Sequence, residues 1–168
     1  LRRSSALSTN TTRDDTWQVT VTPTDGVDSG TPGVATVTIG NGLPDAGSVS
    51  ITPNPATSTD TLSCQAVGPV DVDGDPVSST FAWTVDGNDA GVTTSVLGPD
   101  AFTSSSMVTC TVVPNDGFED GPPRTSGVIT IGNTPPSAPG VLITPDPALT
   151  SDALNPVITV QSEDPDGS

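Results

Sequence analysis

The amino-acid sequence predicts an all-β protein built from tandem β-sandwich units, and three observations support this prediction. Valine, isoleucine and leucine alternate with threonine and serine along much of the chain, which is typical of strands that bury one face. These segments are separated by turns rich in glycine and proline, which account for 17 and 18 of the 168 residues. Blocks of sequence also recur in the same order at a nearly constant spacing. No segment has the periodicity of a helix.

The spacing of the recurring blocks sets the length of one unit. Gly26 and Gly117 end one pair of blocks and lie 91 residues apart, and Ile51 and Ile143 begin another pair and lie 92 residues apart. A unit of about 92 residues is long enough for one β-sandwich. The four pairs of blocks are 19–26 and 110–117, 38–41 and 130–133, 51–56 and 143–148, and 71–74 and 164–167.

This period divides the chain into one complete unit and two partial ones. We expect residues 42–133 to form the complete unit, residues 1–41 to be the C-terminal half of a preceding unit, and residues 134–168 to supply the first strands of a following unit. The chain is then a window onto a longer array. An alternative stays open, in which the partial units pair between chains and make the protein a polymerising subunit.

Alternation and turn residues locate the strands of the complete unit. Each strand has an inward set of side chains at every second position. The expected strands lie near residues 49–52, 61–67, 80–85, 91–97, 107–113 and 126–131. The inward sets of the second, third and fifth of these are Leu62, Cys64 and Ala66, then Phe81, Trp83 and Val85, then Val108, Cys110 and Val112.

Three of these inward residues carry a resemblance to a known family. Cys64, Trp83 and Cys110 fall in the order, on the strands and with the facing of the Cys–Trp–Cys arrangement in immunoglobulin domains, so residues 42–133 resemble an immunoglobulin-like β-sandwich. The resemblance implies that a disulfide between Cys64 and Cys110 joins the two sheets and that Trp83 packs on it. A pair of reduced thiols in the core is the alternative.

The loops extend this resemblance over the whole chain. The acidic segments 71–76 and 114–117 are similar to loops of the immunoglobulin-like and cadherin-like tandem repeats of bacterial and archaeal surface proteins. The resemblance implies an extracellular scaffold, adhesin or fibre. We therefore expect a structural or adhesive segment of a fibre or cell-surface stalk, whose partners are neighbouring repeats or like subunits, with another cell surface or a glycan as the target of adhesion.

Acidic side chains near one end of the complete unit form a candidate metal site. Asp71, Asp73 and Asp75 have the alternating spacing that calcium-binding loops use, although the distal glutamate of an EF-hand is missing. In a sandwich of this type the loop that carries them lies beside the turn between the last two strands. Ca²⁺ bound there would offset the repulsion between carboxylates, whereas ordinary solvated Asp-Gly turns are the alternative. That turn adds Asp116, Glu119 and Asp120, close to Gly40 and Asn41, where the preceding unit joins.

The charge of the chain excludes two classes of partner. Twenty acidic residues against four arginines give a net charge of −16, and the chain has no lysine. Such a surface repels nucleic-acid phosphates and anionic lipid, so we expect neither a nucleic-acid partner nor insertion into a membrane.

The sequence also argues against an enzyme. The chain has no histidine, the commonest proton-transfer residue near neutral pH and the commonest zinc ligand, and both cysteines belong to the expected core. A carbohydrate-binding module is the alternative from the binding class, but it needs exposed aromatic platforms, and Trp83 is expected to face inward.

Two features of the N-terminal segment bear on localisation. Leu1, Arg2 and Arg3 lead into serines and threonines instead of an apolar core, so we expect a processed product or an excerpt. Asn10 begins an Asn-Thr-Thr sequon for N-glycosylation, which favours export to the cell surface or the extracellular space.

Overall fold

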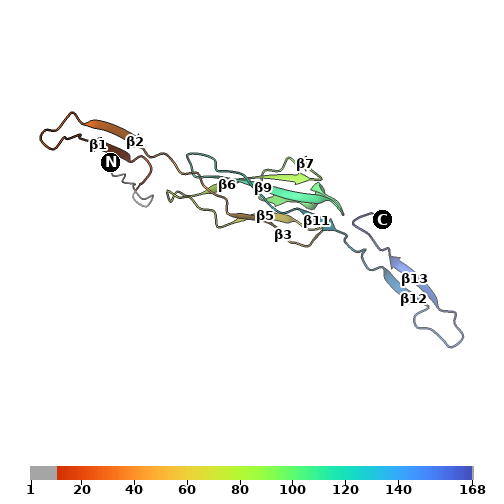
Figure 1. Ribbon diagram of the computed structural model, residues 1–168. Coiled ribbons are helices and arrows are strands. Elements are labelled where there is room, and N and C mark those ends of the chain that lie inside the picture. Colours follow the sequence, from red (N-terminus) through yellow and green to blue (C-terminus); the bar gives the residue numbers. More distant parts are fainter. Residues whose placement is uncertain (1–10, 168) are drawn as a thin grey trace.

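The structure, a computed structural model, describes residues 11–167. The described chain is all-β apart from a short 3-10 turn at Pro99–Ala101, and it is elongated, with a central pair of sheets and a two-stranded hairpin toward each end (Figure 1). Asn10 of the expected sequon lies outside the described residues.

The central pair of sheets, here called the central sandwich, contains the strands β3 to β11. In the three-stranded sheet β5 lies between β3 and β8, and both neighbours are antiparallel to it. In the other sheet the order is β4-β11-β9-β6-β7, with β4 parallel to β11 and β10 also paired with β9. The strands are β3 (Ser48–Thr52), β4 (Ala56–Thr57), β5 (Leu62–Val67), β6 (Ser78–Val85), β7 (Asn88–Asp89), β8 (Val96–Leu97), β9 (Met107–Asn115), β10 (Arg124–Thr125) and β11 (Ile129–Gly132).

Each of the six strands expected from the sequence has a counterpart, but the strand expected over 91–97 is reduced to the two residues of β8. Strand β7 was not expected; it forms because Asp86 and Gly87, both at positive φ, turn the chain back onto β6. Of the strand expected over 126–131 only the part from Ile129 forms, as β11, and a separate strand, β10, precedes it at Arg124–Thr125. Between them Ser126 donates its backbone N–H to the carbonyl of Cys110 and accepts a hydrogen bond from the backbone N–H of Cys110 on its Oγ.

The core lies between the two sheets and is centred on Trp83. This residue is fully buried, and its Nε1 donates a hydrogen bond of 2.9 Å to the carbonyl of Thr94. A disulfide joins Cys64 on β5 to Cys110 on β9, with the Cα atoms 6.2 Å apart, as expected from the resemblance. Leu62, Val108 and Val112 of the expected inward sets are also fully buried. The remaining inward residues, Ala66, Phe81 and Val85, are half-buried and pack against the edge of the core.

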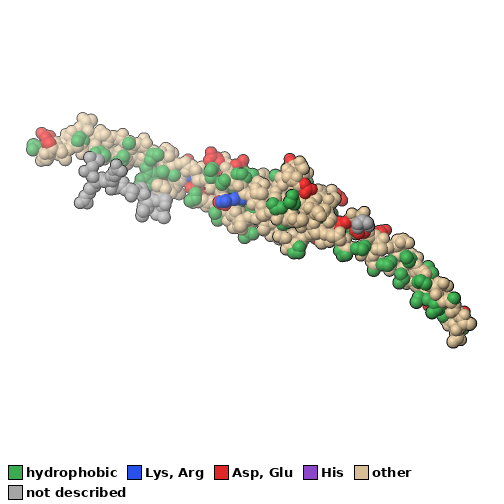
Figure 2. All heavy atoms as spheres, turned by 45° about the vertical axis from the view of Figure 1, so that its right-hand side comes forward, with side chains coloured by type: hydrophobic (Ala, Val, Ile, Leu, Met, Phe, Trp, Pro, Cys, Tyr) green, Lys and Arg blue, Asp and Glu red, His purple; other side chains and the backbone are tan. Residues whose placement is uncertain are grey.

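Each end of the described chain is a hairpin that has no second sheet against it. The N-terminal hairpin pairs β1 (Thr16–Val21) with β2 (Gly33–Thr38), and the C-terminal hairpin pairs β12 (Gly140–Thr144) with β13 (Asn155–Val160). Figure 2 shows apolar side chains on the surface of both hairpins. A lone two-stranded hairpin is marginally stable in water, so these surfaces are suited to further packing. The exposed apolar residues include Trp17, Val19, Val21, Val34 and Val37 at one end and Val141, Leu142, Ile143, Val157, Ile158 and Val160 at the other.

Candidate functional site

The loop between β5 and β6 is organised around the side chain of Asp71. Its Oδ1 accepts hydrogen bonds from the backbone N–H groups of Asp73, at 2.8 Å, and Asp75, at 3.2 Å. Gly74 adopts a φ of +85° and donates its N–H to the carbonyl of Asp71, which closes the turn. The second oxygen of Asp71, Oδ2, is buried and accepts no hydrogen bond from the described residues.

This turn brings the three alternating aspartates together, as their spacing predicted. Asp71, Asp73 and Asp75, here called the acidic triad, each offer a carboxylate oxygen, and these oxygens lie within 4.8 Å of one another. All three residues are half-buried. Hard cations such as Ca²⁺ bind clustered carboxylate oxygens, so the acidic triad could hold a metal ion.

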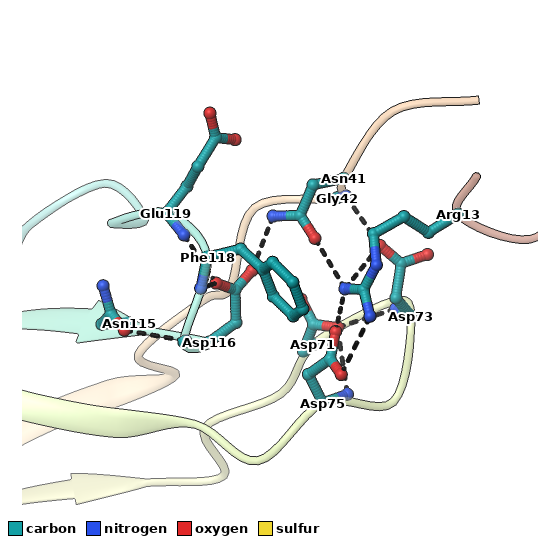
Figure 3. Close-up of polar contacts among 11 residues, drawn as sticks. Arg13, Asn41, Gly42, Asp71, Asp73, Asp75, Asn115, Asp116, Phe118 and Glu119 are labelled. Atoms are coloured by element: carbon teal, nitrogen blue, oxygen red, sulfur yellow. Dashed lines mark hydrogen bonds and ion pairs between the residues drawn. The ribbon is translucent and has the colours of Figure 1, made fainter. Parts of the chain in front are cut away.

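The guanidinium of Arg13 lies against the acidic triad. Both of its terminal nitrogens contact the carboxylate of Asp75, and Nη1 lies 4.0 Å from Oδ2 of Asp73 (Figure 3). Nη1 also donates a hydrogen bond of 2.8 Å to Oδ1 of Asn41. The guanidinium carbon lies 4.0 Å from the centroid of the Phe118 ring. The hydrogen bond to Asp75 raises the pKa of Arg13. The chain therefore supplies its own cation to the acidic triad.

Asn41 connects Arg13 to the turn after β9. Its Nδ2 donates a hydrogen bond of 2.7 Å to Oδ2 of Asp116, whose residue is only 3% exposed. The other oxygen of Asp116 accepts from the backbone N–H groups of Phe118 and Glu119, each at 2.8 Å. These hydrogen bonds, with that from Asn41 the strongest, lower the pKa of Asp116 from 3.8 to about 2. Asp116 is therefore not part of the acidic triad but is linked to it through Asn41 and Arg13.

The other two acidic residues predicted for the site do not join it. The carboxylate of Glu119 points away from Arg13 and the acidic triad, and the residue is exposed (Figure 3). Asp120 is also exposed, and its Oδ1 accepts a hydrogen bond of 2.8 Å from Nδ2 of Asn115. The reason is local. Because the backbone N–H groups of Phe118 and Glu119 both bond to the carboxylate of Asp116, the turn closes around Asp116 and directs the side chains of Glu119 and Asp120 away from the acidic triad.

The linker between β2 and β3 contacts the same loop. The backbone N–H of Gly42 donates a hydrogen bond of 2.7 Å to Oδ2 of Asp73. A side-chain carbon at position 42 would collide with the side chain of Val72, so a larger residue there would require Val72 to move. The linker is thus tied to the acidic triad through backbone as well as side chains.

Sequence reasoning missed Arg13 and Phe118, although a signal for the first was present. Residues 13–15 precede β1 and residues 39–41 follow β2, and antiparallel pairing brings these two segments together. Asp14 donates its N–H to the carbonyl of Ile39, and Ile39 donates to the carbonyl of Asp15. A basic residue placed just before β1 must therefore lie near Asn41. The position of Phe118, an exposed residue at the tip of a turn, had no comparable signal.

A second ion pair does not involve the acidic triad. Nη2 of Arg124 on β10 contacts Oδ2 of Asp45 at 2.7 Å, and both side chains are more than one third exposed. The hydrogen bond to Arg124 lowers the pKa of Asp45. Exposed pairs of this kind contribute little to stability, so this one provides a useful comparison for Arg13.

Comparison of the chain with models of known protein families, with curated proteins and with solved structures finds no match. Within residues 11–167 no helix is long and apolar enough to cross a membrane. The junction described above, between the N-terminal hairpin and the central sandwich, is therefore the site from which a function can be inferred.

Proposed function

We propose that this chain is a structural segment of an extracellular array of tandem immunoglobulin-like β-sandwiches, a stalk or fibre that carries out no catalysis. The observation that carries the proposal is that both end hairpins have the strand register of the corresponding strands in the central sandwich. Neighbouring units of the same array, or like subunits of a fibre, are then the partners.

The N-terminal hairpin matches strands β9, β10 and β11. Adding 91 to residue numbers in β1, and 91 or 92 to those in β2, converts four of the six pairings into pairings of the central sandwich, and the two in the middle fall where β10 and β11 are divided by one extra residue. On this basis Val19 corresponds to Cys110, and Val37 corresponds to Ile129. The matching pairs are Thr16↔Thr38 with Met107↔Thr130, Trp17↔Val37 with Val108↔Ile129, Thr20↔Val34 with Thr111↔Thr125, and Val21↔Gly33 with Val112↔Arg124.

The C-terminal hairpin matches strands β3 and β5 in the same way. Adding 92 to both partners gives an observed pairing in four cases. Ile143 then corresponds to Ile51, and Pro156 corresponds to Cys64. The matching pairs are Val49↔Ala66 with Val141↔Ile158, Ser50↔Gln65 with Leu142↔Val157, Ile51↔Cys64 with Ile143↔Pro156, and Thr52↔Ser63 with Thr144↔Asn155.

The junction before the central sandwich corresponds to the junction after it. Gly42 donates its N–H to Oδ2 of Asp73, and Thr134, 92 residues after Gly42, donates its N–H to Oδ2 of Asp166. Within the two loops, Asp73 donates to Oδ1 of Asp71, and Asp166 donates to Oδ1 of Asp164. This favours a regular array in which each linker is held by the acidic loop of the unit that follows it.

The layout of the central sandwich supports the immunoglobulin-like assignment. A three-stranded sheet with β5 at its centre faces a sheet that contains β9 and β6, the disulfide Cys64–Cys110 joins them, and Trp83 packs on it. A disulfide is also typical of proteins outside the cytosol, which supports an extracellular location. Trp83 is buried, so it is not available as a platform for a sugar ring.

Calcium binding at the acidic triad is the finer part of the proposal. Asp71, Asp73 and Asp75 provide the oxygens, and Oδ2 of Asp71 is buried with no hydrogen bond from the described residues. Since Arg13 contacts the carboxylates of two of these residues, a calcium ion competes with the guanidinium for the same oxygens. Calcium would then stabilise the folded loop by mass action, because it binds only the folded form.

Electron microscopy of the native assembly tests the proposed function. We expect a thin fibre or stalk with sandwich-sized units repeated along its length. Compact isolated particles with no repeating unit would contradict the proposal.

A second candidate is head-to-tail assembly between chains, which the two exposed hairpin faces favour. The side chains exposed at Val19 and Pro156 correspond to Cys110 and Cys64, which meet across the core of the central sandwich. The N-terminal hairpin of one copy thus presents a face that fits the C-terminal hairpin of another.

A further inference from the structure

We propose that the end of the central sandwich formed by the loop 71–75 and the turn 115–120 is a docking surface for an arginine, and that Arg13 is the residue that fixes the orientation of the preceding unit on it. This inference deepens the proposed function, on which it rests, because it names the contact that makes one junction of the array stiff. We call the contacts of Arg13 with Asn41, Asp73, Asp75 and Phe118 the arginine clamp.

The first argument is geometric. The guanidinium of Arg13 is planar and is contacted from three separate segments: Asp75 in the loop, Asn41 in the linker and Phe118 in the turn (Figure 3). A bidentate contact in the plane together with an aromatic ring over the face leaves the group little freedom to rotate. Arg13 lies three residues before β1, and the two residues between them, Asp14 and Asp15, pair with Ile39 after β2, so fixing the Arg13 side chain fixes the start of the N-terminal hairpin.

The second argument is electrostatic. The side chains of Arg13, Asp73 and Asp75 are 22%, 14% and 19% exposed, so their interaction is less screened by salt than that of a surface pair. In the described part of the chain, the ion pairs of the acidic triad are all made with Arg13. Without it, half-buried carboxylates face one another with no positive charge between them.

The third argument concerns Phe118. Phe118 lies at the tip of a turn and is 62% exposed with Arg13 in place, so the central sandwich does not bury its ring. Here its ring is the surface on which the guanidinium lies. The corresponding residue of the turn in the N-terminal hairpin, 91 residues earlier, is Val27, which has no ring to offer. The aromatic residue therefore belongs to the docking surface of this junction in particular.

The opposite end of the central sandwich indicates that the clamp is selective. The residue that corresponds to Arg13 there is Ser104, 91 residues later, and uncharged donors make the contacts. Thr134 donates its N–H to Oδ2 of Asp166 at 2.6 Å, and its hydroxyl lies 2.8 Å from that of Ser58. The two junctions of this chain are thus chemically different, and the one with Arg13 is the stiffer.

Spin labels on the complete chain test the clamp. Nitroxides are attached at Thr36→Cys on β2 and Gln65→Cys on β5, both exposed sites, and the distance distribution between them is measured by pulsed electron paramagnetic resonance. We expect a narrow distribution in the otherwise unmodified chain and one at least about twofold broader with Arg13→Ser. Arg13→Lys keeps the charge but loses the planar fork, so an intermediate width is expected. Arg124→Ser changes net charge by the same amount without removing any contact of the arginine clamp and should leave the distribution narrow.

Asp75→Asn provides a test from the other side of the pair. It removes the charge but keeps an oxygen acceptor, and its effect should not add to that of Arg13→Ser. A distribution that is broad before any change at position 13, or equally narrow after Arg13→Ser, overturns the clamp, as does equal broadening by Arg124→Ser. These outcomes leave the proposed array untouched, since its own test is the repeat seen by electron microscopy.

Discussion

The amide of Asn41 donates a hydrogen bond of 2.7 Å to the buried carboxylate of Asp116, which ties the linker after β2 to the turn after β9. The oxygen of the same amide accepts a hydrogen bond from Arg13. One side chain thus couples an acidic turn and a cation that would otherwise lie in separate parts of the molecule. The junction is held by a chain of polar contacts that runs from Asp116 through Asn41 and Arg13 to Asp75.

The pH dependence of stability should report on this contact. The pKa of Asp116 falls from 3.8 to about 2 on folding, so its ionised form is favoured in the folded state. The stability that it contributes is present above about pH 4 and is lost as the pH falls toward about 2. With Asn41→Ala the folded pKa rises toward the ordinary value, so stability should change less over this window. Urea unfolding across the window and an NMR titration of the Asp116 carboxyl provide the measurement. Equal pH dependence in both proteins would show that Asn41 does not set this pKa.

The disulfide should account for a large part of the stability of the central sandwich. It closes a separation of 46 residues, which in the chain-entropy model is worth ~4 kcal/mol. We expect Cys64→Ala with Cys110→Ala to lower the free energy of unfolding by about that amount. Urea unfolding followed by Trp83 fluorescence measures it. A Ser63→Ala variant, one residue away on the half-buried face of β5, is the control and should change stability little. Stability unaffected by loss of both cysteines would contradict the prediction.

The central sandwich should fold without the two hairpins. Residues 42–133 contain all the residues of the buried core, so the segment should unfold in one cooperative transition with Trp83 buried. Expression of the segment and a thermal scan provide the measurement. A segment that stays unfolded while the complete chain folds would mean that strands of the hairpins contribute to this core.

The interior of the central sandwich was predictable from the sequence, because alternation in β5, β6 and β9 fixes which side chains point inward. Leu62, Trp83 and Cys110 were assigned in this way, and all are buried. The division of the last strand was not predictable, since it depends on hydrogen bonds between Ser126 and Cys110 that only the packed structure forms. Hydrophobic patterns give no information on such contacts.

The candidate site was predictable in part, for a related reason. The spacing of Asp71, Asp73 and Asp75 fixes their proximity, because a single tight turn contains them. The directions of Glu119 and Asp120 depend on how the turn closes around Asp116 and could not be read from composition. The long side chain of Arg13 reaches the site from 58 positions before Asp71, a contact that no local pattern contains.

Calcium binding can be separated from general charge screening by comparing two variants, Asp73→Asn and Asp120→Asn, that change the net charge of the chain equally. At constant ionic strength, Asp73→Asn should weaken calcium binding at least ~tenfold, because it removes one charged ligand of the acidic triad. Arg13→Ser should strengthen binding, because the guanidinium no longer competes for Asp75. Asp120→Asn makes the same charge change outside the acidic triad and should have no effect. Calorimetric titration measures all four proteins. Absence of calcium binding in all four proteins would contradict the proposed calcium site and leave Arg13 as the cation that the acidic triad binds.

Head-to-tail assembly can be tested by copying the core disulfide onto the hairpins. Val19 corresponds to Cys110 and Pro156 to Cys64, so Val19→Cys with Pro156→Cys should place the two new thiols opposite each other when the N-terminal hairpin of one chain packs on the C-terminal hairpin of another. The two positions lie toward opposite ends of the elongated molecule, which excludes a bond within one chain (Figure 1). Mild oxidation should then give a ladder of linked chains on a non-reducing gel.

The control for this experiment uses the other face of the same strand. Gln18→Cys replaces Val19→Cys, and because neighbouring side chains of a strand point to opposite faces, its thiol should face away from the partner hairpin. The amount of linked chains should therefore fall strongly when Gln18→Cys replaces Val19→Cys. Random collision between chains would give the same ladder with either pair of cysteines. Association of this kind depends on apolar surface, so the ladder should persist at high salt, where contacts between charged surfaces are screened. Monomers alone, at all protein concentrations, would contradict assembly between chains and favour an array in which each unit is completed within a single chain.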